Sequence, residues 1–140
     1  MAWEQRRREI LEVLSESLAT EKKSVKVYEL MAERATGIDD KEDILAIRTG
    51  EQKHYLILSQ LYREQCGDHF RYNPSSLALP QRFGDMLQMA IYEELAAVRR
   101  YQRLLSLFSC NRSKSQVAAI AAEEKEHARI LGAMHRTFRS

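Results

Sequence analysis

Residues 121–131 read Ala-Ala-Glu-Glu-Lys-Glu-His-Ala-Arg-Ile-Leu, and this stretch decides the fold. Around it, apolar residues recur in alternating steps of three and four, which is typical of the buried stripe of an amphipathic helix. Glu124 and His127 fall on that stripe, at positions where apolar side chains are expected. Because a buried carboxylate or imidazole costs free energy unless it has a polar partner, the stripe predicts partners for both residues.

The chain repeats its own pattern after a shift of 73 residues, and the shift needs no gap. It places Glu51 on Glu124 and His54 on His127, so the Glu-x-x-His pattern occurs twice. The same shift aligns further pairs in the two halves: Glu21 with Glu94, Val25 with Val98, Tyr28 with Tyr101, Ile47 with Ile120 and Leu58 with Leu131. Such a repeat predicts two copies of one helical hairpin, with the duplicated polar residues on inward-facing stripes.

The chain organisation follows from this repeat. We expect one domain over residues 1–140, with a helical hairpin over 3–65, a crossover over 66–80 and a second hairpin over 81–137. The crossover contains glycine and prolines and has no apolar periodicity. Fifteen extended residues reach at most about 50 Å, which exceeds the roughly 37 Å of a 25-residue helix. The crossover can therefore return the chain to the far end of the bundle, which predicts an all-α, ferritin-like four-helix bundle.

Helix geometry brings the duplicated polar residues to one level. Glu21 lies about 24 Å before the first turn, and the Glu51–His54 segment lies about 18 to 23 Å after it, at 1.5 Å per residue. The second hairpin has the same spacing and gives the same result. The sequence therefore predicts one buried group of four carboxylates and two imidazoles: Glu21, Glu51, His54, Glu94, Glu124 and His127.

Two divalent metal ions account best for this group. Four buried carboxylates without cations would repel one another and take up protons. One Glu from each of two helices, with a Glu-x-x-His from each of the other two, is the ligand pattern of di-iron and di-manganese carboxylate bundles. Oxygen and nitrogen donors favour iron or manganese over ions that prefer thiolates, and the sequence does not separate these two metals.

Other polar residues near this group have different expected roles. Tyr28 and Tyr101 lie two turns after Glu21 and Glu94 on the same stripes. Because a buried phenol needs a hydrogen-bond partner, we expect each to contact a metal-ligating carboxylate. Glu123 lies off the stripe and is expected on a solvated helix face.

Composition excludes several classes of protein. The net charge of +2, with both signs interspersed, argues against a nucleic-acid partner. No apolar stretch is long enough to span a bilayer, and no signal-peptide segment follows Met1. The two cysteines are far apart and form no Cys-x-x-Cys, which indicates reduced thiols and a cytoplasmic protein.

With these residues identified, the chain resembles the rubrerythrin/bacterioferritin branch of the ferritin-like superfamily of di-iron carboxylate proteins. The resemblance rests on four segments: Glu21 to Tyr28, Glu51-Gln52-Lys53-His54, Glu94 to Tyr101, and Glu124-Lys125-Glu126-His127. It implies two metal ions bridged by Glu51 and Glu124. Glu21 and His54 would complete the coordination of one ion, and Glu94 and His127 that of the other. It also implies a reaction of reduced di-iron with peroxide or dioxygen.

The chain departs from the family at three points. Rubrerythrins carry an extra carboxylate where this chain has Ala97, so the site is expected to be symmetric, as in bacterioferritin. The rubredoxin-like Cys-x-x-Cys module is absent, which implies a separate electron-donor protein. Gln52 replaces the haem-binding methionine of bacterioferritins, so no haem is expected. The chain ends near the fourth helix, which favours a homodimer over a storage shell.

The leading functional hypothesis is a di-iron oxidoreductase of the peroxidase or ferroxidase type, which reduces hydrogen peroxide or oxidises Fe(II). An iron-storage protein would bind many more than two irons per chain and form a large particle. A di-iron monooxygenase would need an apolar substrate pocket or a membrane-facing surface. A metal-free structural bundle would bind no metal and would melt unchanged after chelation.

Overall fold

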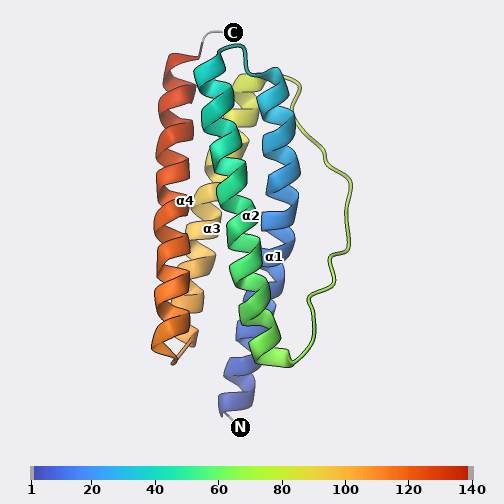
Figure 1. Cartoon of the computed structure of the whole chain (residues 1–140), viewed down its shortest axis with the longest axis vertical. Coiled ribbons are helices and arrows are strands. Elements are labelled where there is room, and N and C mark those ends of the chain that lie inside the picture. The colour runs from blue at the N-terminus through green and yellow to red at the C-terminus, as the bar shows by residue number, and fades with distance from the viewer. Residues whose placement is uncertain (1, 139–140) are drawn as a thin grey trace.

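A computed structural model describes residues 2–138 and contains four α-helices over that range (Figure 1). They are α1 (Ala2–Arg34), α2 (Ile38–Cys66), α3 (Phe83–Leu107) and α4 (Asn111–Thr137). The predicted all-α class and four-helix bundle are therefore confirmed. The predicted domain over 1–140 also includes residues 1 and 139–140, which lie outside the described range. None of the described helices is long and apolar enough to cross a membrane.

Helices in contact run antiparallel. The chain passes up α1 and down α2, returns along the outside of α1, and then passes down α3 and up α4 (Figure 1). α1 packs against α2 and α3, and α4 packs against α3 and α2, so α1 and α4 lie on one diagonal of the bundle. The crossover spans residues 67–82, because α2 ends later and α3 begins later than the sequence predicts.

Two arginines of α1 hold the ends of the crossover. Arg7 Nε donates to the carbonyl oxygen of Gln65 at 2.8 Å, near the end of α2. At the other end of α1, Arg34 donates to the carbonyl oxygens of Pro80 and Gln81, both at 3.0 Å. The loop therefore returns along α1 with each end tied to that helix.

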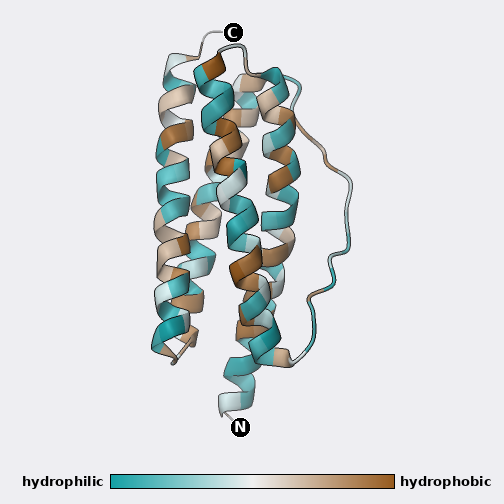
Figure 2. Cartoon of the chain, in the orientation of Figure 1, coloured by the Kyte–Doolittle hydropathy of each residue, from teal (hydrophilic) through white to brown (hydrophobic). Residues whose placement is uncertain are grey.

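The buried apolar residues form two clusters rather than one continuous core. One cluster includes Leu14, Leu18, Leu58 and Leu104, and the other includes Met31, Ile44, Leu87 and Leu131. On all four helices, the predicted polar residues lie between the segments that supply the two clusters. Figure 2 shows hydrophobic and hydrophilic residues alternating along each helix, as in amphipathic helices. We call the six predicted residues the polar layer.

The 73-residue shift aligns residues of one apolar cluster with residues of the other. Leu14 of the first cluster is shifted onto Leu87 of the second, and Leu58 is shifted onto Leu131. A twofold relation between the hairpins, with its axis passing through the polar layer and across the bundle, accounts for this exchange. The sequence repeat is thus also a repeat in packing.

Equivalent core positions should therefore contribute similarly to stability. Leu14 and Leu87 are both 0% exposed. We expect Leu14→Ala and Leu87→Ala each to lower the free energy of unfolding by about 2 to 5 kcal/mol, because each leaves a cavity. Urea unfolding measures this, with Leu56→Ala at a 70% exposed position as the control. A loss below about 1 kcal/mol at either leucine would contradict the two-cluster description.

Candidate metal centre

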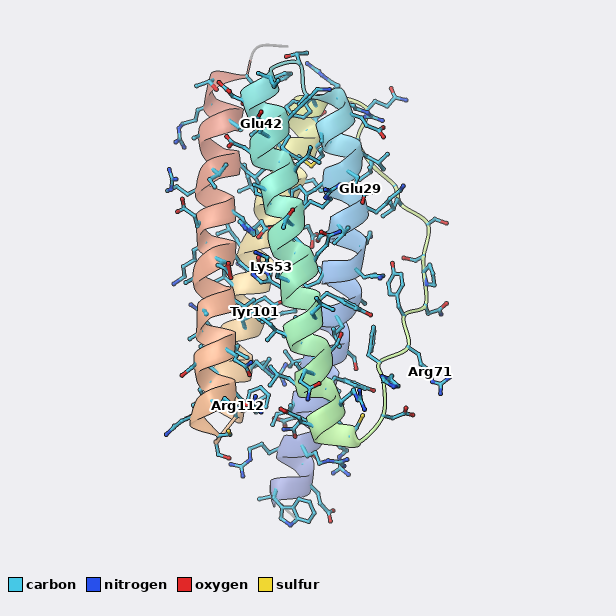
Figure 3. All side chains as sticks on the ribbon, viewed as in Figure 1. Glu29, Glu42, Lys53, Arg71, Tyr101 and Arg112 are labelled. Atoms are coloured by element: carbon cyan, nitrogen blue, oxygen red, sulfur yellow. The ribbon has the colours of Figure 1, made fainter. Side chains whose placement is uncertain are left out.

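The structure brings together all six residues that the sequence predicts, and each helix contributes to the group. α1 supplies Glu21, α3 supplies Glu94, and α2 and α4 each supply a Glu and a His one turn apart. Their exposed fractions are all 8% or less. Figure 3 shows labelled Tyr101 between the helices, whereas labelled residues such as Arg71 lie at the outside. The polar layer is thus a buried feature of the interior.

The six side chains form two overlapping groups. In each group, the candidate ligand atoms of four residues all lie within 4.8 Å of one another: Glu21, Glu51, His54 and Glu124 in the first, and Glu51, Glu94, Glu124 and His127 in the second. Glu51 and Glu124 belong to both groups. This overlap is the arrangement expected when two carboxylates are shared by two neighbouring ions.

Both imidazoles present Nδ1 to the carboxylates. Three oxygens lie near His54 Nδ1: Glu124 Oε1 at 3.1 Å, Glu21 Oε2 at 3.6 Å and Glu51 Oε2 at 3.9 Å. Three lie near His127 Nδ1: Glu51 Oε1 at 3.0 Å, Glu124 Oε1 at 3.2 Å and Glu94 Oε2 at 3.5 Å. An octahedral ion with ligands at about 2.1 Å separates its ligand atoms by about 3.0 to 4.2 Å. The spacing therefore fits metal coordination.

Unpaired polar atoms also support metal coordination at this layer. Four atoms of the layer have no hydrogen-bond partner among the described residues: Glu21 Oε2, His54 Nδ1, Glu94 Oε2 and Glu124 Oε1. Buried polar atoms are normally paired. His54 Nδ1 and Glu124 Oε1 are close, yet they are not aligned for a hydrogen bond with each other. Two metal ions between these atoms would satisfy all four, so the residues present fit such a pair.

The two tyrosines reach across the bundle. Tyr28 of α1 donates its hydroxyl to Glu94 Oε1 at 2.5 Å, and Tyr101 of α3 donates to Glu21 Oε1 at 2.8 Å. Each phenol therefore contacts the carboxylate of the opposite hairpin, a pairing that the sequence did not specify. Burial, together with the charge of the contacted carboxylate, raises the pKa of both tyrosines, so both phenols stay protonated as donors.

The carboxylates of the layer titrate unusually. Burial raises the pKa of Glu51 well above its usual value, and repulsion from Glu21 raises it further. Burial also raises the pKa of Glu124 to about 7. Burial acts on Glu21 in the same direction, but the close approach of Glu51 and His54 outweighs it, so the pKa of Glu21 is lowered. The layer therefore favours a mixture of ionised and protonated carboxyl groups.

The imidazoles bind protons tightly for a related reason. Burial alone lowers the pKa of a histidine, but hydrogen bonds and charges of neighbouring carboxylates outweigh it here. The pKa of His54 is raised to about 11, chiefly by Glu124 and Glu21. The pKa of His127 is raised to about 9, chiefly by Glu124 and Glu94. Protons on these rings supply the positive charge that the carboxylates require, and bound metal ions would displace them.

Sequence reasoning missed one residue of this site. Glu123 was expected on a solvated face, and its side chain is indeed 57% exposed, but its Oε2 lies 3.0 Å from His54 Nε2. It thus contacts the ring nitrogen that faces away from the other carboxylates. The sequence could have indicated this contact, because Glu123 directly precedes Glu124. A side chain next to the inward-facing stripe can reach a residue of the neighbouring helix.

Comparison with known proteins identifies the fold. No family model matches this chain, and no curated protein matches its sequence. A ferritin-like, diiron-carboxylate protein from Bacillus anthracis has a TM-score of 0.80 at 22% identity, covering 93% of this chain and 97% of that chain. A hypothetical protein from Pyrococcus furiosus has a TM-score of 0.80 at 20% identity, covering 91% and 88%.

A bacterioferritin is also similar. The Desulfovibrio desulfuricans protein, whose structures describe a diiron site in different catalytic states, has a TM-score of 0.77 at 17% identity, covering 96% of this chain and 82% of that chain. At these identities the likeness establishes the fold alone. The chain is a ferritin-like four-helix bundle, as the sequence predicts, and its interior carries a carboxylate–histidine group suited to binding metal.

The raised pKa values predict how the metal-free protein responds to pH. His127 at about 9 and His54 at about 11 hold protons that the unfolded chain releases near 6.5. The free energy of unfolding should therefore fall as pH rises from 6.5 to 9, by up to about 1.4 kcal/mol per pH unit for each imidazole. Urea unfolding with a chelator present measures this fall.

The metal-loaded protein is the control for this measurement. Bound ions replace the protons, so its stability should depend less on pH over the same interval. A metal-free protein that is equally stable at pH 6.5 and pH 9 would contradict the described environment of the imidazoles.

Proposed function

We propose that this protein is a non-haem di-iron oxidoreductase of the rubrerythrin-like type, whose carboxylate-bridged iron pair reacts with hydrogen peroxide or dioxygen. The observation that carries the proposal is the overlap of two four-residue groups at Glu51 and Glu124, inside a buried layer. The donor set of oxygens and imidazole nitrogens suits iron or manganese, and the proposal takes iron.

The proposed ligands divide evenly between the two ions. Glu51 and Glu124, which belong to both groups, would be shared by the two ions, and Glu21 with His54 would hold one ion and Glu94 with His127 the other. Four carboxylates neutralise two divalent cations, so the complete site carries no large net charge. This balance supports burial of the site between two apolar clusters.

When bound, a pair of ferrous ions would supply two electrons, which together with two protons from solvent would reduce hydrogen peroxide to two molecules of water. The chain contributes a fixed and water-poor environment for that chemistry. Tyr28 and Tyr101 donate hydrogen bonds to Glu94 and Glu21, which orients these carboxylates. The apolar clusters on either side limit the access of bulk water to the layer.

The residue at position 97 bears on the choice of oxidant. Ala97 lies one turn after Glu94 and is 2% exposed, so a methyl group occupies the place where rubrerythrins carry an additional carboxylate. The resulting symmetric ligand set supports a centre like that of bacterioferritin. We therefore include oxidation of Fe(II) by dioxygen in the proposal, alongside peroxide reduction.

The proposed cycle needs partners. Because the ferrous state must be regenerated, we propose a separate electron-donor protein. We also propose a homodimer. We propose that it binds no haem, since Gln52 stands where bacterioferritins have the haem-binding methionine.

Iron loading tests the proposal. Anaerobic titration with Fe(II) should give two ions per chain, and one equivalent of peroxide should oxidise both. The double variant Glu51→Gln, Glu124→Gln should bind iron at least about tenfold more weakly, because it removes both shared carboxylates. Elemental analysis and stopped-flow absorbance measure the two quantities.

The matched control is Glu126→Gln. Glu126 is on α4 as well, but it is exposed and paired with Arg129, so its loss should leave iron binding unchanged. Unaltered iron oxidation in the double variant would overturn the proposal. Uptake of many more than two irons per chain into a large particle would instead identify an iron-storage protein.

A further inference from the structure

The two histidines of the polar layer are equivalent in the repeat, yet their outward-facing nitrogens differ in environment. His54 Nε2 lies 3.0 Å from Glu123 Oε2. The 73-residue shift places Glu123 on Gly50, so the corresponding position beside His127 has no side chain. Among residues 2–138, the hydrogen bond of His127 is made through Nδ1, and none is found at its Nε2.

Gly50 is explained by the His127 ring rather than by its own backbone. It lies within α2, where glycine destabilises a helix by about 0.5 to 1 kcal/mol relative to alanine. Gly67 is the one glycine among residues 2–138 with a positive φ, so Gly50 has no such conformational requirement. A Cβ atom at position 50 would lie 3.0 Å from His127 Cε1 and 3.1 Å from Nε2. The missing side chain therefore makes room for the imidazole.

Exposure separates the two rings in the same way. The His54 side chain is 1% exposed and the His127 side chain is 10% exposed. Glu123 contacts the outer nitrogen of His54, whereas Gly50 packs against the outer edge of His127 without offering a side chain. The two halves of the layer thus differ in the hydrogen-bond partner of the outer ring nitrogen and in the exposure of the ring.

The contact with Glu123 also fixes the state of the His54 ring. A carboxylate accepts hydrogen bonds, so Nε2 donates its proton to Glu123, and the proton that a metal ion would displace is the one on Nδ1, which faces the candidate ion position. A hydrogen bond of this kind orients a ligating imidazole and increases its basicity. Loss of such a partner typically weakens metal binding by about 10- to 100-fold.

We propose that Glu123 is a positioning residue that makes the ion position at His54 the tighter of two unequal metal positions, and that the position at His127, beside Gly50, is the weaker and more exchangeable one. This inference rests on the proposed metal centre and adds that its two positions differ in affinity for the metal ion. The ion at His127 is lost first on chelation and returns last on loading.

Variants that each retain one imidazole test this order without interference between two bound ions. His127→Ala leaves the His54 position, and His54→Ala leaves the His127 position. Anaerobic titration with Co(II), followed by its visible absorbance, should give a Kd about tenfold or more lower for His127→Ala than for His54→Ala. Adding Glu123→Ala should weaken the His127→Ala protein by about tenfold or more and leave the His54→Ala protein unchanged.

Controls separate this inference from the metal proposal itself. Glu126→Ala removes an exposed carboxylate of the same helix and should alter neither affinity. Because Glu123 is exposed, its replacement should leave the circular dichroism spectrum of the bundle unchanged. Equal Co(II) affinities in the two single-histidine variants, or equal effects of Glu123→Ala on both, would overturn the inference while the metal centre stands. A folded wild-type chain that binds no Co(II) would overturn both.

Discussion

Repulsion among four buried carboxylates is the constraint on which the rest of this structure depends. Two unit charges 4 Å apart interact by about 4 kcal/mol at the effective dielectric constant of a protein. The candidate ligand atoms of each group lie within 4.8 Å of one another, so ionisation of these carboxylates requires positive charge at the same depth. The two imidazoles lie within 3.0 to 3.9 Å of these carboxylates and provide it when protonated. Two divalent ions would provide it more completely, and the unpaired ligand atoms fit them.

The repeat explains how one chain builds such a layer. Each hairpin contributes three of the six residues and part of both apolar clusters, so each half completes the other. The phenol of each hairpin also crosses to the carboxylate of the other half, Tyr28 to Glu94 and Tyr101 to Glu21. Stability and the candidate function are consequently linked, because the packing that forms the core also sets the distances among the ligand atoms.

The sequence predicts much of this arrangement because polar residues on an apolar stripe are conspicuous. Glu124 and His127 interrupt a helical period, and the repeat identifies their equivalents without coordinates. Features that depend on neighbouring helices were not predictable in this way. The contact of Glu123 with His54 needs the orientation of two helix faces, and the role of Gly50 appears only when the His127 ring is seen beside it. The side of the bundle along which the crossover returns was likewise undetermined by its length.

The central claim is that two metal ions hold the polar layer together. Anomalous diffraction on both sides of the iron absorption edge, from crystals of anaerobically iron-loaded protein, tests it most directly. The account predicts two iron peaks about 3.5 to 4 Å apart, one about 2.1 Å from His54 Nδ1 and the other at a similar distance from His127 Nδ1. A single peak, or iron bound only at the surface, would contradict it.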